Sequence, residues 1–352
     1  MANILVIRLS AIGDVAMTVP VIYSAAKANP TDTFTVLTQS FLIPVFINRP
    51  KNVEVIGINT KSTEKSLAGV LRFASALVKY DFDVVLDLHN VLRTMVIRSV
   101  FRLYGKSVFV LDKARRDRIR LTERKKKKIN QLRPVVERYA DVFRKAGLKY
   151  SECFHSLFEE REPDLSCLDL LAGTKVGRWI GVAPFAKHQG KIYPIEKMEC
   201  VVMELVKRDD ITIFLFGGRG GYEESLLGEW AAKSPRIKSV VGKYSLDQEL
   251  ALISRLDLLL CMDSANMHFA SLVGTRVLSI WGATHPYAGF YGYHQDPDDC
   301  IQLDMPCRPC SVFGQKACWR GDLACMRQIT EEKIVNKVLI SLKETITNEG
   351  SH

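Results

Sequence analysis

The sequence predicts an α/β protein made of two doubly wound domains, each with a parallel sheet. Three observations lead to this prediction. The chain has 352 residues, more than one hydrophobic core usually serves. Apolar runs of strand length alternate with amphipathic runs of helix length, which is typical of βα units. Polar and glycine-rich loops follow several of the strand-like runs, where folds of this class place their ligands.

The first half of the chain contains one complete βα series. Its expected strands are Ile4–Leu9, Phe34–Thr38, Val53–Ile58, Val84–His89 and Val108–Leu111. Its expected helices are Val15–Ala28, Leu67–Lys79, Val91–Leu103 and Pro134–Ala146. Because helices join successive strands, these strands should form one parallel sheet.

A second βα series follows the less periodic segment from 149 to 177. Its expected strands are Ile180–Pro184, Thr212–Phe216, Ser239–Val241, Leu258–Met262 and Val277–Trp281. Its expected helices are Ile195–Lys207, Tyr222–Ala232, Leu246–Arg255, Asn266–Val273 and Thr330–Thr347. We therefore expect a first domain over 1–175, a second over 176–330, and a C-terminal helix and tail over 331–352. Two such domains facing across a cleft would bind a ligand at the carboxyl ends of their strands.

Composition and patterning favour a cytoplasmic protein. Hydrophobic residues make up 47% of the chain and charged residues 25%, which is ordinary for a globular protein. No apolar run approaches the roughly 20 residues that span a bilayer. Arg8 and Asp14 interrupt the apolar N-terminal stretch, which does not resemble a signal peptide.

The excess positive charge is concentrated in residues 113–133, "KARRDRIRLTERKKKKINQLR". This segment holds eleven Lys or Arg and two acids, against a net charge of +10 for the whole chain. Such a run is typical of an exposed, mobile segment, or of a segment that binds a polyanion. No zinc-finger, RNP-like or helix-turn-helix pattern accompanies it, so we do not expect nucleic acid as the partner. An anionic, membrane-associated substrate is the functional alternative.

The first loop, "RLSAIGDVAMTVP", places Ser10, Gly13 and Asp14 between a strand and a helix. Gly13 allows backbone conformations that other residues resist. Asp14 lies near a helix N-terminus, where a carboxylate commonly caps the helix. The same position keeps a carboxylate ionised, so Asp14 could instead act as a base. The motif lacks the GxGxxG fingerprint of dinucleotide binding.

Two loops of the second half have the composition of phosphate and ribose sites. In "APFAKHQGKIYP", Lys187, His188 and Lys191 precede Pro194, which suits the start of a helix. In "FLFGGRGGYEE", glycines allow close backbone approach to a ligand, and Glu223 or Glu224 could bind ribose hydroxyls. For the first of these loops, the alternative is two ordinary solvated lysines.

The stretch "LLLCMDSANMHFASLVGTRVLSIWG" is the most informative. A buried strand ends at Asp263, and a helix starts within Ser264-Ala265-Asn266. Free backbone N–H groups at such a helix start bind diphosphates. His268 falls in the first turn. The alternative is an N-cap by Asp263 or Ser264, with His268 packed in the core.

Five cysteines cluster near the C-terminus, beginning at Cys300, and the last four have the spacing Cys307-x2-Cys310-x7-Cys318-x6-Cys325. Four thiolates could hold zinc, but the spacing lacks the second C-x2-C pair that is typical of such sites. We favour a structural role and keep zinc as the alternative.

Taken together, these loops resemble glycosyltransferase family 9, the ADP-heptose:lipopolysaccharide heptosyltransferases. The matching pieces, in the family's order, are "ILVIRLSAIGDVAMTVP", "VLDLHNVLRT", "GKIYP", "FGGRGGYEE", "MDSANMHFASLVGTRVLSIWGATHP" and "CRPCSVFGQKACWRGDLAC". The resemblance implies a GT-B fold of two Rossmann-like domains, with the donor held mainly by the second domain and the acceptor by the first.

The resemblance also implies roles for individual residues. Asp14 matches the catalytic base, Lys191 the lysine on the donor phosphates, and Glu224 or its neighbour Glu223 the acid on the ribose. The donor-binding element matches Asp263, Ser264, Ala265, Asn266 and His268, with Ser264 and Ala265 standing where the family usually has Thr and Gly. The acceptor side would comprise Ser10, Gly13, His89, Asn90, Arg93 and Arg120.

The implied reaction is inverting transfer of heptose from ADP-heptose to the lipid A–Kdo inner core, with no metal or other cofactor required. In this reading residues 113–133 bind the anionic acceptor and contact the inner face of the cytoplasmic membrane, and the enzyme is a monomer. Two alternatives stay open. One is a GT-B transferase that uses another nucleotide sugar. The other is a non-catalytic protein that binds anionic lipid or nucleic acid.

Overall fold

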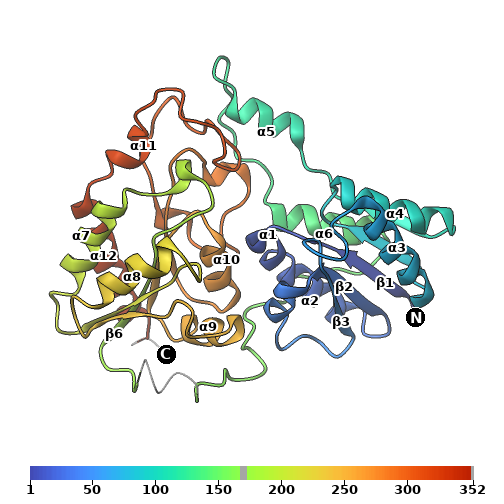
Figure 1. Ribbon diagram of the computed structural model, residues 1–352, viewed down its shortest axis with the longest axis horizontal. Coiled ribbons are helices and arrows are strands. Elements are labelled where there is room, and N and C mark those ends of the chain that lie inside the picture. The colour runs from blue at the N-terminus through green and yellow to red at the C-terminus, as the bar shows by residue number, and fades with distance from the viewer. Residues whose placement is uncertain (167–172, 350–352) are drawn as a thin grey trace. The chain divides into compact units, whose positions relative to one another are not determined.

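The computed structural model describes residues 1–166 and 173–349, and the chain divides into two units. The first unit comprises residues 1–114 and 133–161. The second comprises residues 115–132 and 162–352. Each unit contains one parallel sheet with helices packed on it (Figure 1). This is the predicted α/β class with two doubly wound sheets.

The first sheet has the strand order β3-β2-β1-β4-β5, and all its pairs are parallel. Its strands are β1 (Asn3–Ile7), β2 (Thr33–Gln39), β3 (Val53–Ile58), β4 (Val84–Asp87) and β5 (Ser107–Val110). The central strand β1 reads "NILVI" and is buried on both faces, as a parallel strand between two helix layers must be.

The helices of the first unit are α1 (Ile12–Ala16), α2 (Val19–Ala28), α3 (Leu67–Leu77), α4 (Leu92–Leu103) and α6 (Val135–Lys145), with 3₁₀ turns η1 (Ser40–Val45) and η2 (Val78–Tyr80). The single helix expected over Val15–Ala28 is two helices. Pro20 has no N–H for a helical bond and its ring excludes the carbonyl one turn earlier, so the chain breaks before α2. The Thr18 hydroxyl donates to the Val15 carbonyl at 2.7 Å and closes the end of α1.

The second sheet has the order β11-β10-β9-β6-β7-β8 and is also parallel. Its strands are β6 (Arg178–Ala183), β7 (Ile211–Leu215), β8 (Ile237–Ser239), β9 (Leu258–Met262), β10 (Val277–Ile280) and β11 (Cys300–Ile301). The last of these was not predicted, because two residues inside a loop carry no periodic signal.

The helices of the second unit are α5 (Arg115–Thr122), α7 (Ile195–Leu205), α8 (Tyr222–Ala231), α9 (Leu246–Ile253), α10 (Ala265–Leu272), α11 (Ala324–Arg327) and α12 (Glu331–Glu349), with 3₁₀ turns η3 (Gln189–Lys191), η4 (Pro286–Ala288) and η5 (Pro297–Asp299). Helix α12 packs on α7, and its Ile334 and Val338 enter the core of this unit. The C-terminal helix is thus part of the second unit. Residues 167–172 of the expected interdomain connection and 350–352 of the expected tail lie outside the described residues.

Each sheet changes direction once, and these switch points position the predicted loops. In the first sheet the order reverses between β1 and β4, so the loops after these strands start side by side. In the second sheet it reverses between β6 and β9. The crevice outside the carboxyl ends of two such strands is the usual ligand site of doubly wound folds. The loops with Asp14 and His89 meet at one switch point, and those with Lys191 and Asp263 at the other.

The basic segment differs from expectation in place and in structure. The sequence prediction put residues 113–133 in the first domain, but residues 115–132 belong to the second unit and begin with α5. Aromatic and carbonyl contacts within that unit explain this. The Arg118 guanidinium lies 4.7 Å from the Phe290 ring centre, that of Arg124 lies 4.2 Å from the Trp319 ring, and Lys127 donates to the Cys307 carbonyl at 2.7 Å.

The described helices are all too short or too polar to cross a membrane.

Candidate functional site

Asp14 lies in the first turn of α1, just past the carboxyl end of β1. Its Oδ2 forms an ion pair with Arg8 at 2.7 Å and accepts the Ala11 backbone N–H at 3.3 Å. The Asp14 side chain is 20% exposed, while that of Arg8 is 7% exposed and also donates to the Leu88 carbonyl. A nearly buried arginine therefore fixes the carboxylate at the switch point of the sheet.

The capping prediction for Asp14 needs a correction of position. Ala11 is the N-cap of α1, and Asp14 is the third helical residue, whose carboxylate reaches back to the N-cap amide. Gly13 lies inside this helix, so its backbone is helical and not one of the conformations that favour glycine. Both residues remain at the tip of the first βα turn.

The turn after β4 is built on a buried carboxylate. Asp87 accepts the backbone N–H groups of His89 and Asn90, at 2.9 and 2.7 Å, and pairs with Arg98 at 2.7 Å. Asn90 has a φ of +51° and donates its side-chain amide to the Leu111 carbonyl. The Asp87–Arg98 pair thereby holds a tight turn that presents His89 beside the first loop.

His89 lies within reach of Ser10, with Nε2 and Oγ 3.4 Å apart. Burial, helped by the charges of Arg8 and Lys113, lowers the pKa of His89 to about 2. The imidazole is therefore neutral across the physiological range. The predicted acceptor residues Ser10, His89 and Asn90 thus share one switch point with Asp14.

Two further predicted acceptor residues, Arg93 and Arg120, are exposed. Arg93, in the first turn of α4, donates to the Lys65 carbonyl at 3.4 Å. Arg120 is in α5 and so belongs to the second unit, where its nearest acid is Asp117 at 3.9 Å. The grouping of Arg120 with a first-domain acceptor site is corrected accordingly.

In the second unit, Lys191 and Asp263 form an ion pair at 2.9 Å. Lys191 ends η3, in the loop after β6, and Asp263 directly follows β9. The Thr284 hydroxyl donates to the same Asp263 oxygen at 2.8 Å. Both charged side chains are largely buried, with exposures of 16% and 7%. Two loops that are far apart in sequence thus place one cation at the second switch point.

The cysteine-containing loop positions Lys191. Gly314, at a φ of +80°, lies so close to Lys191 that a Cβ there would come within 2.5 Å of the lysine Cγ. The Gly190 carbonyl accepts the Ala283 N–H at 2.9 Å. The Ala283 carbonyl in turn accepts the Ser311 N–H at 3.1 Å. The aliphatic part of the Lys191 side chain therefore packs directly on the backbone of Gly314, where any larger residue would collide with it.

Helix α10 starts at the end of β9, as predicted. Ser264 is its N-cap, and the buried Ser264 Oγ has no hydrogen-bond partner in the described part of the chain. Ala265 and Asn266 follow as the first two helical residues and are half-buried. His268 is 6% exposed, one turn into the helix. The N-terminus of α10 therefore lies beside the Lys191–Asp263 pair. Backbone N–H groups at a helix N-terminus, together with a lysine, are typical of an anion-binding site.

The glycine-rich loop is held by both candidate glutamates. Glu223 accepts the Gly218 N–H, and Glu224 accepts the Gly220 N–H, each at 2.6 Å. Gly220 and Gly221 have φ values of +82° and +73°, so the glycines are required by the backbone itself. The two acids lie in the first turn of α8, where a carboxylate also stabilises the helix.

The four clustered cysteines have no metal-binding arrangement in the part of the chain that the structure describes, where no three His, Cys, Asp or Glu side chains are placed to hold an ion. Burial raises the pKa of Cys325 to about 11 and also raises that of Cys310, which keeps both thiols protonated. Arg308 helps to hold this loop, because its guanidinium donates to the carbonyls of Gly282, Leu303 and Thr284.

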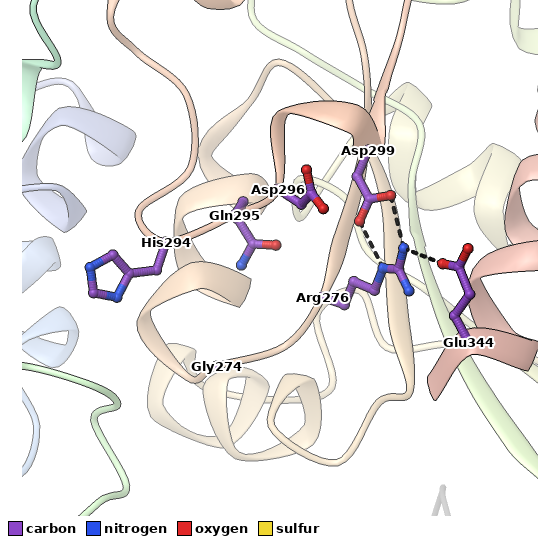
Figure 2. A pocket seen from close by; sticks show the side chains of 7 residues that line it. All are labelled: Gly274, Arg276, His294, Gln295, Asp296, Asp299 and Glu344. Carbon is purple, nitrogen blue, oxygen red and sulfur yellow. Dashed lines mark hydrogen bonds and ion pairs between the residues drawn. The ribbon is translucent and has the colours of Figure 1, made fainter. Parts of the chain in front are cut away.

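A cavity of about 520 Å³ lies in the second unit, away from these loops (Figure 2). It is lined by Gly274, Arg276, His294, Gln295, Asp296, Asp299 and Glu344. Arg276 precedes β10 and Asp299 precedes β11, so the cavity lies at the amino edge of the sheet. Figure 2 shows Arg276 bound by Asp299 and Glu344, at 2.7 and 2.9 Å. These ion pairs connect α12 to the sheet, and we assign the residues around the cavity a structural role.

Sequence reasoning missed the residues that hold the predicted ones. Arg8, Asp87 and Arg98 were not singled out, and neither were Thr284 and Gly314. Arg8 and Asp87 carry a usable signal, because a charged residue at the end of a buried parallel strand is rarely there for packing. The contact of Gly314 with Lys191 has no sequence signal, since it depends on how a long irregular loop folds.

Solved structures with the same architecture support the fold. An Escherichia coli ADP-heptose LPS heptosyltransferase II aligns with a TM-score of 0.70 and 17% identity, over 97% of this chain and 99% of that one. A family 9 glycosyltransferase from Veillonella parvula aligns with a TM-score of 0.72 and 18% identity, over 97% and 98%. The two parallel-sheet units have the architecture of the GT-B fold.

Sequence comparison narrows the class. The model of glycosyltransferase family 9 (heptosyltransferase) matches residues 70–318, and the chain belongs to this family. Lipopolysaccharide heptosyltransferase 1 of Pseudomonas aeruginosa is 24% identical over 324 residues, which cover 88% of this chain and 86% of that protein. Lipopolysaccharide heptosyltransferase 3 of Escherichia coli is 24% identical over 287 residues, covering 77% and 80%.

Proposed function

We propose that this glycosyltransferase moves a heptose, with inversion, from ADP-heptose to the lipid A–Kdo inner core of lipopolysaccharide or lipooligosaccharide. Support comes from the names of the relatives, which are lipopolysaccharide heptosyltransferases, and from a solved heptosyltransferase of the same fold that carries ADP-2-deoxy-2-fluoro heptose. The observation that carries the proposal is the pairing of Lys191 with Asp263 directly before the open N-terminus of α10.

That grouping suits a nucleoside diphosphate. Lys191 supplies a positive charge, and the backbone N–H groups of Ala265 and Asn266 supply donors at the positive end of a helix dipole. Asp263 and Gly314 fix the lysine in place, so little reorganisation is needed when the diphosphate binds. Glu224, with Glu223 beside it, is the proposed partner of the ribose hydroxyls. In this proposal the lysine and the helix N-terminus neutralise the leaving group, without a required metal.

Asp14 is the proposed general base. It takes the proton from an acceptor hydroxyl, and that oxygen attacks the anomeric carbon of the donor from the face opposite the diphosphate. The bond from the anomeric carbon to the diphosphate oxygen breaks, and ADP leaves with the electron pair. The neutral His89, with a pKa of about 2, is a poor competitor for this role. Ser10, Gly13, His89, Asn90 and Arg93 are proposed to contact the acceptor.

The exposed cations of the basic segment are proposed to meet the acceptor's phosphates and carboxylates. Arg120 and its neighbours Arg115, Arg116, Lys125, Lys126 and Lys128 are exposed, while Arg118 and Lys127 make contacts inside the second unit. We place this monomeric enzyme in the cytoplasm, at the inner face of the membrane that carries the acceptor.

Two substitutions test the assignment together. Asp14→Asn should lower turnover by roughly 10²–10⁴-fold, the usual contribution of a general base, and leave ADP affinity close to wild type. Lys191→Ala should weaken ADP binding and slow turnover. Calorimetric ADP titration and ADP-release assays with purified acceptor measure both quantities.

Asp247→Asn is the matched control for Asp14→Asn, because Asp247 is also a first-turn carboxylate, in α9. Turnover by Asp14→Asn at the wild-type rate would reduce Asp14 to a helix-stabilising residue. Equal ADP affinity in wild type and Lys191→Ala would show that the donor diphosphate does not bind at Lys191.

The donor sugar is tested separately. Ala265 adds a methyl group at the first position of α10, where the phosphates would approach most closely. Thermal-shift measurements with ADP-heptose and with UDP- and GDP-sugars compare donors without needing the acceptor. We expect the largest shift with ADP-heptose, and a larger shift with another nucleotide sugar would favour a GT-B transferase of different donor specificity.

A further inference from the structure

The N-terminal halves of α3 and α4 carry four large apolar side chains that the fold does not bury. On α3, Leu67 is 48% exposed and Leu71 is 49% exposed, while Val70 and Ala74 face the core. On α4, Leu92 is 62% exposed and Met95 is 45% exposed. We call these four residues the apolar surface. Single exposed leucines are ordinary, but four on two neighbouring helices need an explanation.

The four residues of the apolar surface lie toward the same end of two neighbouring helices. Helices α3 and α4 pack against each other in the first unit (Figure 1). Arg93, in the first turn of α4, donates to the carbonyl of Lys65, just before α3. Leu67 and Leu92, the first residues of their helices, therefore lie at the same end of the pair.

The charges around the apolar surface have one sign. The two segments 59–77 and 91–103 contain six Lys or Arg and a single acid, Glu64. Glu64 is half-buried and accepts the Asn59 N–H at 2.9 Å, and Arg98 is paired with a buried aspartate. The other five cations are exposed, namely Lys61, Lys65, Arg72, Arg93 and Arg102. Exposed leucines within a cationic rim are typical of surfaces that rest on anionic lipid.

We propose that the apolar surface docks the protein on an anionic phospholipid bilayer. The leucines enter the boundary between headgroups and acyl chains, and the rim cations bind lipid phosphates. Helices α3 and α4 start at the carboxyl edge of the first sheet, the edge at which the Asp14 loop follows β1. The docked protein would then hold that loop close to the headgroups. This last consequence rests on the proposed function, in which the acceptor is a membrane lipid.

Vesicle sedimentation tests the docking without donor or acceptor. The full chain is spun with vesicles of phosphatidylcholine alone and of phosphatidylcholine with phosphatidylglycerol. Wild type should bind the second kind, and the variant L67S/L71S/L92S/M95S should bind at least about tenfold less. Because these side chains are exposed, its thermal midpoint should stay near that of wild type. Val176→Ser with Ile340→Ser, two exposed apolar residues of the second unit, is the matched control.

A second variant tests whether the cations around the apolar surface bind lipid phosphates. K65Q/R72Q/R93Q should remove most of the preference for phosphatidylglycerol, by roughly fivefold per cation. Asp14→Asn should bind vesicles as wild type does, so a failed catalytic proposal leaves this result intact. K125Q/K126Q/K128Q tests the basic segment as the competing site.

Three outcomes would overturn the proposal. Wild type could fail to bind either kind of vesicle. The apolar-surface variant could bind as well as its control while K125Q/K126Q/K128Q loses binding, which would move the contact to the basic segment. Wild type could form a dimer that the apolar-surface variant lacks, without vesicle binding, which would make the surface an interface between copies.

Discussion

At the scale of single residues, the candidate site depends on side chains that hold other side chains. Arg8 fixes Asp14, Asp87 fixes the His89 turn, and Asp263 fixes Lys191. Each support is largely buried and charged, and each meets a charged or backbone partner at 2.7–2.9 Å. Rigid placement of this kind is what catalysis by preorganised charge requires.

Gly314 should prove as necessary for donor binding as the lysine it contacts. In Gly314→Ala the new methyl group would come within 2.5 Å of Lys191 Cγ, so the lysine stem must move. We expect ADP affinity to fall by roughly tenfold, the effect of losing one well-placed charged contact. Calorimetric ADP titration measures this.

Gly321→Ala separates that contact from backbone strain. Gly321 lies in the same loop at a φ of +81°, but a Cβ there meets nothing within 4 Å. Both variants should lose about 1 kcal/mol of folding stability, and only Gly314→Ala should lose ADP affinity. Equal ADP affinities in the two variants would show that the Gly314 contact does not position the lysine.

At the scale of elements, the basic segment is a structured part of the second unit with two sets of cations. Arg118, Arg124 and Lys127 contact aromatic rings or carbonyls, whereas Lys125, Lys126 and Lys128 are exposed. Activity on the natural acceptor should therefore fall steeply with salt, because screening weakens exposed charge contacts.

K125Q/K126Q/K128Q should flatten that salt dependence and leave ADP affinity unchanged. Initial rates across a salt series measure the slope. The matched control replaces three exposed lysines outside the segment, Lys51, Lys145 and Lys207. A wild-type rate that does not respond to salt, or a slope that the control flattens equally, would contradict this role of the segment.

How well the sequence predicts an element depends on where its signal lies. β3 and β9 have the predicted bounds, because their apolar runs end sharply at polar or glycine-rich loops. The break between α1 and α2 could have been predicted from Pro20. Helix α5 was missed because its stability comes from contacts with Phe290 and the loop around it, and not from an apolar face of its own.

The same distinction holds for the site. The family motifs located the loops with Asp14, Lys191 and Asp263, and parallel topology then brings two loops to each switch point. The ion pair of Asp14 with Arg8 and the crossing of Lys191 over Gly314 depend on side-chain packing. Sequence periodicity does not encode packing of that kind.

At the scale of the whole molecule, two units with separate cores should respond to pH differently. Burial raises the pKa of Glu249, in α9 of the second unit, to about 7. The folded-state pKa lies above the ordinary value of 4.5, so folding favours the protonated form. The stability that depends on this proton is complete below pH 4.5 and is lost as the pH rises through 7.

Glu249→Gln should remove that loss. Relative to wild type, the variant should gain about 3 kcal/mol of stability at pH 8 and less than about 1 kcal/mol at pH 5. Denaturant unfolding at the two pH values measures the difference, with Glu229→Gln, an exposed glutamate of α8, as the control. A gain of the same size at both pH values would indicate a packing effect and not a titration.

The contacts of the second unit also set an order for its assembly during synthesis. Residues 115–132 leave the ribosome early, but their ring and carbonyl partners lie at 290–319. Lys191 likewise cannot form its contact with Gly314 until that later segment has been synthesised. Because domains fold as their chains emerge, residues 115–132 lack their partners in the nascent protein until the last quarter of the chain has been synthesised. On a ribosome stalled before residue 290, the first unit would be complete and the proposed donor site would not yet have formed. The exposed cationic segment 115–132 would be able to bind a nearby polyanion.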